Sequence, residues 1–150
     1  MDLIFSILMD AFFIALLAWC AYTDLKARTV SNLSVILLLC LGLAHTGLLA
    51  LDGNAWWPYP AGLLLCTPFF ISWMRNGIGA GDVKLVMGIG LYLGLMNTLI
   101  AFVLMMFVLV VLAIWLWRKG GTTRREIPLA PVISIGAFST IVLGYICVLA

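Results

Sequence analysis

Two aspartates, Asp24 and Asp82, stand at the boundaries of apolar stretches, among residues that could serve a hydrolytic reaction. Asp24 closes an apolar run and is followed by Lys26 and Arg28, whereas Asp82 follows the glycine-containing segment 79–81. Two carboxylates that share one proton can activate water: the ionised one accepts a proton from the water, and the protonated one hydrogen-bonds the attacked carbonyl. The two aspartates therefore indicate acid-base hydrolysis, provided that the fold brings them together.

Each aspartate also has an ordinary structural explanation. Asp24 and Arg28 are four positions apart, so on a helix they could form an exposed ion pair worth a few tenths of a kcal/mol. Asp82 could be the N-cap of the helix that follows it, a position where aspartate is among the preferred residues. Spacing alone favours these structural roles, and the argument for chemistry depends on where the two residues lie relative to each other.

The elements that must position them are built from an unusually apolar chain. Of the 150 residues, 65% are hydrophobic and 9% are charged, a balance that excludes a soluble globular domain. The net charge of +2 is too small to suggest a nucleic-acid partner. The apolar residues gather into stretches that can cross roughly 30 Å of hydrocarbon. We therefore expect an all-α membrane protein whose surroundings are the lipid bilayer.

The stretches predict a bundle of about six transmembrane helices that form a single domain over residues 1–150. The fourth is short and rich in glycine, with Gly90 and Gly94 spaced for close helix contact, so we expect it to be buried in the bundle. The fifth is apolar on every side and is expected to face lipid. The predicted spans are 3–22, 32–51, 57–74, 83–96, 98–117 and 129–149.

The basic residues sort by connection. They fall in or beside the first, third and fifth connections: Lys26, Arg28, Arg75, Lys84, Arg118, Lys119, Arg124 and Arg125. Because cytoplasmic loops are enriched in lysine and arginine, the odd connections should face the cytoplasm and both termini should lie outside it. This places Asp24 and Asp82 at the same side of one bundle, as the active site of an aspartyl peptidase requires.

Three motifs resemble those of a known family. Residues 79–84, Gly-Ala-Gly-Asp-Val-Lys, match the GxGDxK signature of the type IV prepilin peptidases. Residues 24–32 resemble that family's other catalytic stretch, an aspartate followed by basic residues that ends in Ile-Pro-Asn. Residues 128–131, with Gly136 after them, look like the start of the family's last helix. The resemblance extends over nearly the whole chain.

This resemblance implies that Asp24 and Asp82 are the catalytic pair of an aspartic-type endopeptidase without metal or cofactor. Its substrates would be pilin-like precursors, whose short basic leaders are cut at a glycine on the cytoplasmic face of the inner membrane. Six further residues are expected to bind substrate or support the pair: Gly79, Gly81, Lys84, Lys26, Arg28 and Asn32. The two glycines could adopt positive φ and let an extended substrate strand approach.

The chain departs from the family's pattern in two places. It lacks the cytoplasmic insert with paired CxxC motifs of the bifunctional members, so we expect no methyltransferase activity. In this it looks like the short branch associated with tight-adherence (Flp-type) pili. Residues 30–32, Val-Ser-Asn, replace Ile-Pro-Asn, although Ser31 can itself cap the second helix.

Two other functions compete with this interpretation. One is a non-catalytic membrane subunit or assembly factor of a pilus or secretion system, and the other is a presenilin-like enzyme that cuts within membrane spans. The position of Asp24 in a basic connection argues against the presenilin type. The sequence gives neither the substrate nor the oligomeric state.

Four kinds of polar or reactive residue remain. Asp10 lies inside the first span without an apparent partner, and His45 is expected to be a packed histidine. Lys84 either favours the ionised form of Asp82 or extends to the membrane interface. The four cysteines are isolated within apolar runs and are expected to be buried.

Overall fold

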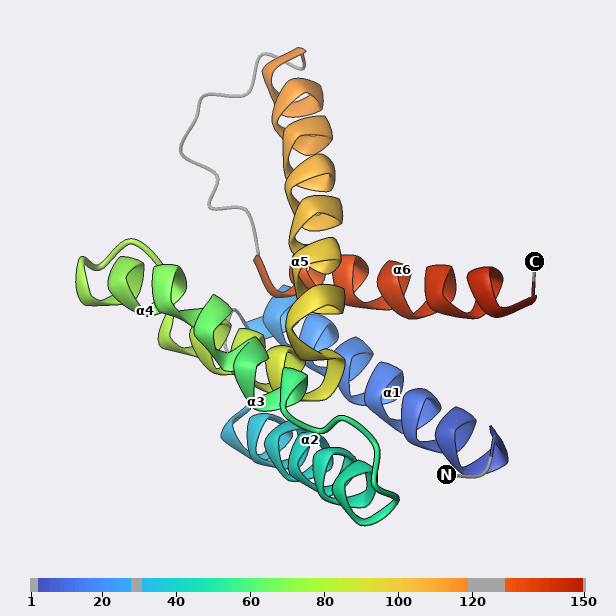
Figure 1. Cartoon of the computed structure of the whole chain (residues 1–150). Helices are drawn as coiled ribbons and strands as arrows, with labels where there is room; N and C mark the ends of the chain where they lie inside the picture. Colours follow the sequence, from blue (N-terminus) through green and yellow to red (C-terminus); the bar gives the residue numbers. More distant parts are fainter. Residues whose placement is uncertain (1–2, 28–30, 119–128, 150) are drawn as a thin grey trace.

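A computed structural model describes residues 3–27, 31–118 and 129–149, and within these residues every regular element is helical (Figure 1). The predicted all-α class of membrane protein is therefore confirmed. In chain order the elements are α1 (Leu3–Ala27), α2 (Asn32–Leu51), α3 (Pro58–Gly62), the 3₁₀ helix η1 (Leu63–Cys66), α4 (Thr67–Met74), α5 (Ala80–Arg118) and α6 (Leu129–Leu149).

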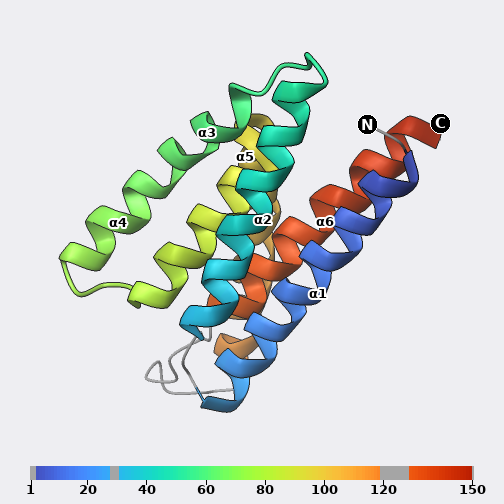
Figure 2. The ribbon, with the colours of Figure 1, turned by 90° about the horizontal axis from the view of Figure 1, so that it is seen from below.

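The helices share two common ends, which Figure 2 shows from below. The end of α1, the start of α2, the end of α4 and the starts of α5 and α6 lie together at the lower left of that view. We call this the aspartate end, because α1 carries Asp24 in its last turns and α5 carries Asp82 in its first turn. The start of α1, the end of α6 and the connection from α2 to α3 lie at the opposite end.

The number of spanning helices differs from the prediction. In the part of the chain that the structure describes, four helices, not six, are long and apolar enough to cross a membrane. They are Ile4–Ala27, Asn32–Leu51, Ala80–Arg118 and Leu129–Cys147. Two local features account for the difference, one in the stretch 57–74 and one in α5.

The stretch 57–74 is helical from Pro58 but is broken by η1 into two short α-helices. Pro68 has no amide hydrogen, so it cannot donate to the carbonyl of Leu64, four residues before it. The hydroxyl of Thr67 donates to that carbonyl instead, at 2.7 Å. The proline thus interrupts the regular hydrogen bonds where the tighter η1 turns meet α4.

Helix α5 joins the predicted spans 83–96 and 98–117 into one element with a kink. At Gly94 the backbone has φ 77° and ψ 175°, a conformation that glycine adopts without the steric cost of a Cβ. The break therefore lies at Gly94, not at the predicted turn around Asn97. Beyond the kink, the second arm of α5 projects away from α1 and α2 (Figure 1).

The two arms of α5 have the environments that the sequence predicts. The first arm is buried along most of its length, and Gly90 approaches Gly62 of α3 so closely that an added Cβ would lie 2.6 Å from the Gly62 carbonyl oxygen. The second arm exposes large apolar side chains such as Val103 and Phe107. Close packing around small residues holds helices together where water supplies no hydrophobic driving force.

The cysteines follow the prediction only in part. Cys20 and Cys66 are buried, whereas Cys40 and Cys147 lie on exposed helix faces. A cysteine within an apolar run can thus face either the protein interior or the lipid, because both surroundings are apolar.

Candidate active site

Asp24 lies near the end of α1 and is only 9% exposed. Its Oδ2 atom is buried and has no hydrogen-bond partner among the described residues. A buried carboxylate oxygen without a donor is costly, because it has lost water and gained nothing in exchange. Such an oxygen is free to bind a proton, a water molecule or a substrate.

Asp82 is the third residue of α5, so it lies in the first turn of the helix and is not its N-cap. Its amide donates to the carbonyl of Gly79 at 3.2 Å, which closes the turn that leads into α5. A carboxylate in the first turn of a helix is stabilised by the exposed amides and the helix dipole.

The fold brings the two aspartates into electrostatic contact. The half-buried carboxylate of Asp82 lies close enough to Asp24 for their charges to interact. The two residues stand 58 positions apart in the sequence, and α1 and α5 bring them to the same end of the bundle.

The glycines before Asp82 do not act as predicted. Among the described residues, the glycines with positive φ are Gly53 and Gly94, so Gly79 and Gly81 do not use that conformation. A Cβ added to Gly79 would lie 3.5 Å from Oδ2 of Asp82, at ordinary contact distance. Glycine at this position therefore leaves one side of the Asp82 carboxylate open.

Two of the predicted supporting residues contact each other. The ammonium group of Lys84 donates to Oδ1 of Asn32 at 3.1 Å, which links the start of α5 to the start of α2. Lys26 is exposed, and its Nζ lies 5.9 Å from the centroid of the Tyr22 ring, so it points along α1. Arg28 lies outside the described residues.

Ser31 is the N-cap residue of α2, as predicted, and its backbone has the extended conformation of an N-cap, with φ −63° and ψ 129°. Its side chain makes no capping hydrogen bond, and its carbonyl accepts from the amide of Val35 at 3.2 Å. The neighbouring contact between Asn32 and Lys84 is one that the sequence motif does not reveal.

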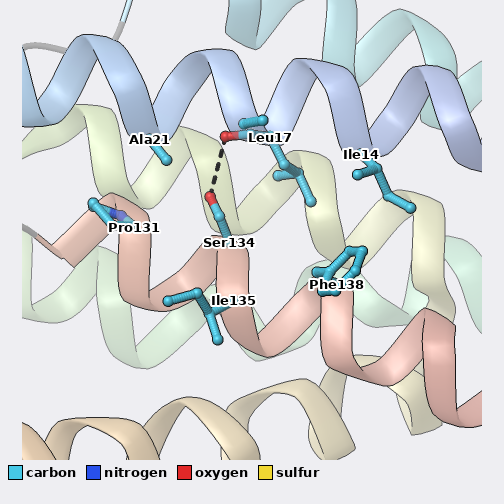
Figure 3. A pocket seen from close by; sticks show the side chains of 8 residues that line it. Ile14, Leu17, Ala21, Pro131, Ser134, Ile135 and Phe138 are labelled. Carbon is cyan, nitrogen blue, oxygen red and sulfur yellow. Dashed lines mark hydrogen bonds between the residues drawn. The ribbon is translucent and has the colours of Figure 1, made fainter.

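An apolar groove runs between α1 and α6 (Figure 3). It encloses about 280 Å³ and begins at Ala21, one helical turn before Asp24. On the α6 side it is lined by Pro131 and Phe138, and the hydroxyl of Ser134 donates across it to the carbonyl of Leu17 at 3.3 Å. This hydrogen bond ties the half of α1 that carries Asp24 to α6.

At the opposite end of the bundle lies a polar cluster that the sequence did not reveal. Asp10 accepts hydrogen bonds from the hydroxyls of Tyr92, at 2.7 Å, and Tyr145, at 2.6 Å. His45 is packed between aromatic rings, with its centroid 4.7 Å from that of Tyr92 and 5.1 Å from that of Tyr59. The prediction that Asp10 has no partner is wrong, and the packing expected for His45 is confirmed.

A signal for this cluster is present in the sequence. An acidic residue inside an apolar span must find donors, and tyrosines at the same depth are the available ones. The sequence does not say which tyrosines meet Asp10, because Tyr92 and Tyr145 come from helices far along the chain.

Comparison with known proteins gives one match. The family model described as the type IV leader peptidase family matches residues 11–114. The matched range includes both aspartates and residues 79–84, whereas α6 and the motif at 128–131 lie beyond it. No curated protein and no solved structure matches the chain.

Proposed function

Because the chain belongs to the type IV leader peptidase family, we propose that it is an aspartyl endopeptidase that removes the short basic leader of pilin-like precursors. The family supports aspartic-type peptidase activity, and the apolar helices make the chain a multi-pass membrane protein. We assign Asp24 and Asp82 as the catalytic pair.

One observation carries this assignment: Asp24, in the last turns of α1, and Asp82, in the first turn of α5, lie at the same end of the bundle, close enough for their charges to interact. Four acids remain besides this pair: Asp2, Asp10, Asp52 and Glu126. Of these, Asp10 belongs to the polar cluster at the opposite end, and Asp52 is the exposed C-cap of α2. Residues 2 and 126 lie outside the described residues.

In the proposed reaction the pair begins with one proton. The ionised carboxylate accepts a proton from water while the water oxygen bonds to the carbon of the scissile peptide group. The protonated carboxyl group donates a hydrogen bond to the carbonyl oxygen, where negative charge develops. The tetrahedral intermediate then collapses, the C–N bond breaks, and the leaving nitrogen receives a proton from the pair.

The test is co-expression with a pilin precursor, in which cleavage is followed as a mobility shift on a gel. Asp24→Asn and Asp82→Asn should each abolish cleavage while the protein still accumulates in the membrane, because asparagine keeps the side-chain size but cannot exchange the proton. Asp52→Asn is the control and should cleave normally. Retained cleavage in either catalytic variant would contradict the assignment, and a wild-type chain that cuts no precursor would favour a non-catalytic subunit or assembly factor.

Mass spectrometry of the product tests two finer parts of the proposal. The leader should be released after a glycine that precedes the hydrophobic segment, as in precursors of tight-adherence (Flp-type) pili. The new N-terminus should be unmodified, because the chain has no insert with paired CxxC motifs. A methylated product from the purified protein would show methyltransferase activity and overturn that part.

We place the aspartate end of the bundle at the cytoplasmic face of the inner membrane, with both termini outside the cytoplasm. Support comes from Lys26, Arg75 and Lys84, which lie on elements that begin or end at the aspartate end. A cysteine introduced at Arg75, in a variant without native cysteines, should resist impermeant thiol reagents in intact cells and react after permeabilisation. Labelling in intact cells would reverse the orientation.

A further inference from the structure

The polar cluster at the end opposite the aspartate end joins three helices through one carboxylate. Oδ1 of Asp10, on α1, accepts the hydroxyl of Tyr92 on α5, and Oδ2 accepts the hydroxyl of Tyr145 on α6. Both bonds are shorter than 2.8 Å, within the range typical of hydroxyl donors to carboxylates. We refer to Asp10, Tyr92 and Tyr145 as the tyrosine cluster.

Two of these helices also carry the proposed catalytic pair. Asp24 lies 14 residues beyond Asp10 on α1, and Tyr92 lies 10 residues beyond Asp82 on α5. At 1.5 Å per residue, the tyrosine cluster is about 21 Å from Asp24 along α1 and about 15 Å from Asp82 along α5. Both segments are uninterrupted helix, since the kink in α5 comes later, at Gly94.

Helices α1 and α5 make little backbone contact with each other. Helix α1 packs mainly against α6 and α2, and α5 packs mainly against α6, α3 and α2, so the position of α1 along α5 is fixed through side chains and through their shared neighbours. Tyr92 makes two direct side-chain contacts with α1: its hydroxyl bonds Asp10, and its ring stacks on Phe13 with centroids 4.0 Å apart. Phe13 is completely buried.

The ring of Tyr92 has little freedom to move. It stacks on Phe13 at an interplanar angle of 10° and also on His45, at 28°. A ring confined in this way holds its hydroxyl at a fixed point, and a hydrogen bond in surroundings of low dielectric is stronger than one in water. A displacement of α1 along α5 would break this bond.

We propose that Tyr92 is a positioning residue: by binding Asp10 and stacking on Phe13, it sets the register of α1 against α5 and thereby the separation of Asp24 and Asp82. The proposal rests on the assignment of these two aspartates as the catalytic pair. Small displacements matter at such a site, because an error of about 1 Å in the placement of reacting groups can cost 100-fold in rate.

Two variants that each remove one hydrogen bond to Asp10 can be compared. Tyr92→Phe and Tyr145→Phe each remove one hydroxyl and one hydrogen bond to Asp10, but only Tyr92 lies on a helix that carries a proposed catalytic aspartate. Tyr92→Phe should lower kcat about tenfold with KM changed less than twofold, whereas Tyr145→Phe should leave kcat within twofold of wild type. The thermal stabilities of the two variants in detergent should fall by similar amounts.

The pH dependence of kcat separates positioning from general loss of stability. The two limbs of the profile depend on how strongly the carboxylates of Asp24 and Asp82 interact, so their spacing on the pH axis should change in Tyr92→Phe and not in Tyr145→Phe. Equal kcat values and equal profiles for the two variants would overturn the proposal.

A second measurement does not require activity. Spin labels on Lys26→Cys and Lys84→Cys, in a variant without the native cysteines, report the distance between α1 and α5 at the aspartate end. The mean distance should shift, or its distribution should broaden, in Tyr92→Phe and stay unchanged in Tyr145→Phe. An unchanged distribution in both would overturn the positioning role, even if the protein cut no precursor and the proposed function failed separately.

Discussion

The two ends of the bundle differ in how the oxygens of a carboxylate are hydrogen-bonded. At one end Asp10 has a hydrogen-bond donor on each oxygen, supplied by two tyrosines from different helices. At the other end Asp24 is also part of the helix bundle, but its Oδ2 is buried without a hydrogen-bond partner among the described residues. Most buried polar atoms in proteins are hydrogen-bonded, so the oxygen of Asp24 needs an explanation, as do Nδ1 of His45 and Oγ1 of Thr98, which also lack a partner among the described residues.

Hydrogen bonding of the carboxylate oxygens thus distinguishes a structural acid from a reactive one in this protein. A carboxylate with a donor on each oxygen has its loss of water compensated and contributes to stability. A buried carboxylate with an unpaired oxygen beside a second acid costs stability and is available for proton transfer. Active sites commonly carry such a cost.

The largest expected effect comes from substitutions of Asp24 and Asp82, alone and together. Asp24→Asn and Asp82→Asn should each lower cleavage by at least about 1,000-fold, and the double variant should lose no more than either single one, because residues that act as a unit are strongly non-additive. Single-turnover cleavage of a purified precursor measures this. Losses that multiply in the double variant would show two independent roles and end the idea of a proton-sharing pair.

The free energy of unfolding should depend more strongly on Asp10 than on Asp24. Asp10→Ala leaves two tyrosine hydroxyls without their acceptor and should destabilise the protein by about 2–4 kcal/mol. Asp24→Ala removes an unsatisfied buried oxygen and should change stability by less than about 1 kcal/mol. Denaturation in detergent by increasing SDS provides the measurement. If Asp24→Ala destabilised the protein as much as Asp10→Ala, both acids would be structural.

The smallest expected effect concerns the exposed link beside the pair. Lys84→Met and Asn32→Ala each break the 3.1 Å hydrogen bond between α5 and α2. Because the bond is exposed, each change should lower the cleavage rate only about two- to fivefold and cost less than about 1 kcal/mol of stability. The double variant should match the single ones, as measured by kcat/KM. A much larger loss for Lys84→Met alone would give Lys84 a role on Asp82 itself.

The sequence predicted the acids of the site better than their surroundings. Residue type, the glycine-containing segment before Asp82 and the distribution of lysine and arginine were enough to place both aspartates at one end. The donors of Asp10 were not predictable, because they stand 82 and 135 residues away in the chain and no local pattern joins them. Such pairings arise from tertiary packing, which hydrophobicity alone does not specify.

For the helices, too, local features were predictable and features that depend on single residues or on packing were not. Apolar stretches identified the helical segments, since length and hydropathy are local properties. The helix count failed where single residues decide the backbone: Pro68 interrupts one stretch, and the non-helical Gly94 joins two helical arms into α5 across a kink. Gly90 was expected to allow close packing, and it does, but its partner, Gly62 of α3, follows from the arrangement of the helices.

The contact between Gly62 and Gly90 constrains the order in which the protein can be assembled during synthesis. The segment Pro58–Met74 leaves the ribosome before α5, yet α3 packs against the first arm of α5 with backbone meeting backbone. Until the first arm of α5 is synthesised, the segment Pro58–Met74 lacks the helix against which α3 packs. The packing of α3 therefore follows the synthesis of the first arm of α5, and Gly90→Ala should weaken it, because the added Cβ would lie 2.6 Å from the carbonyl oxygen of Gly62.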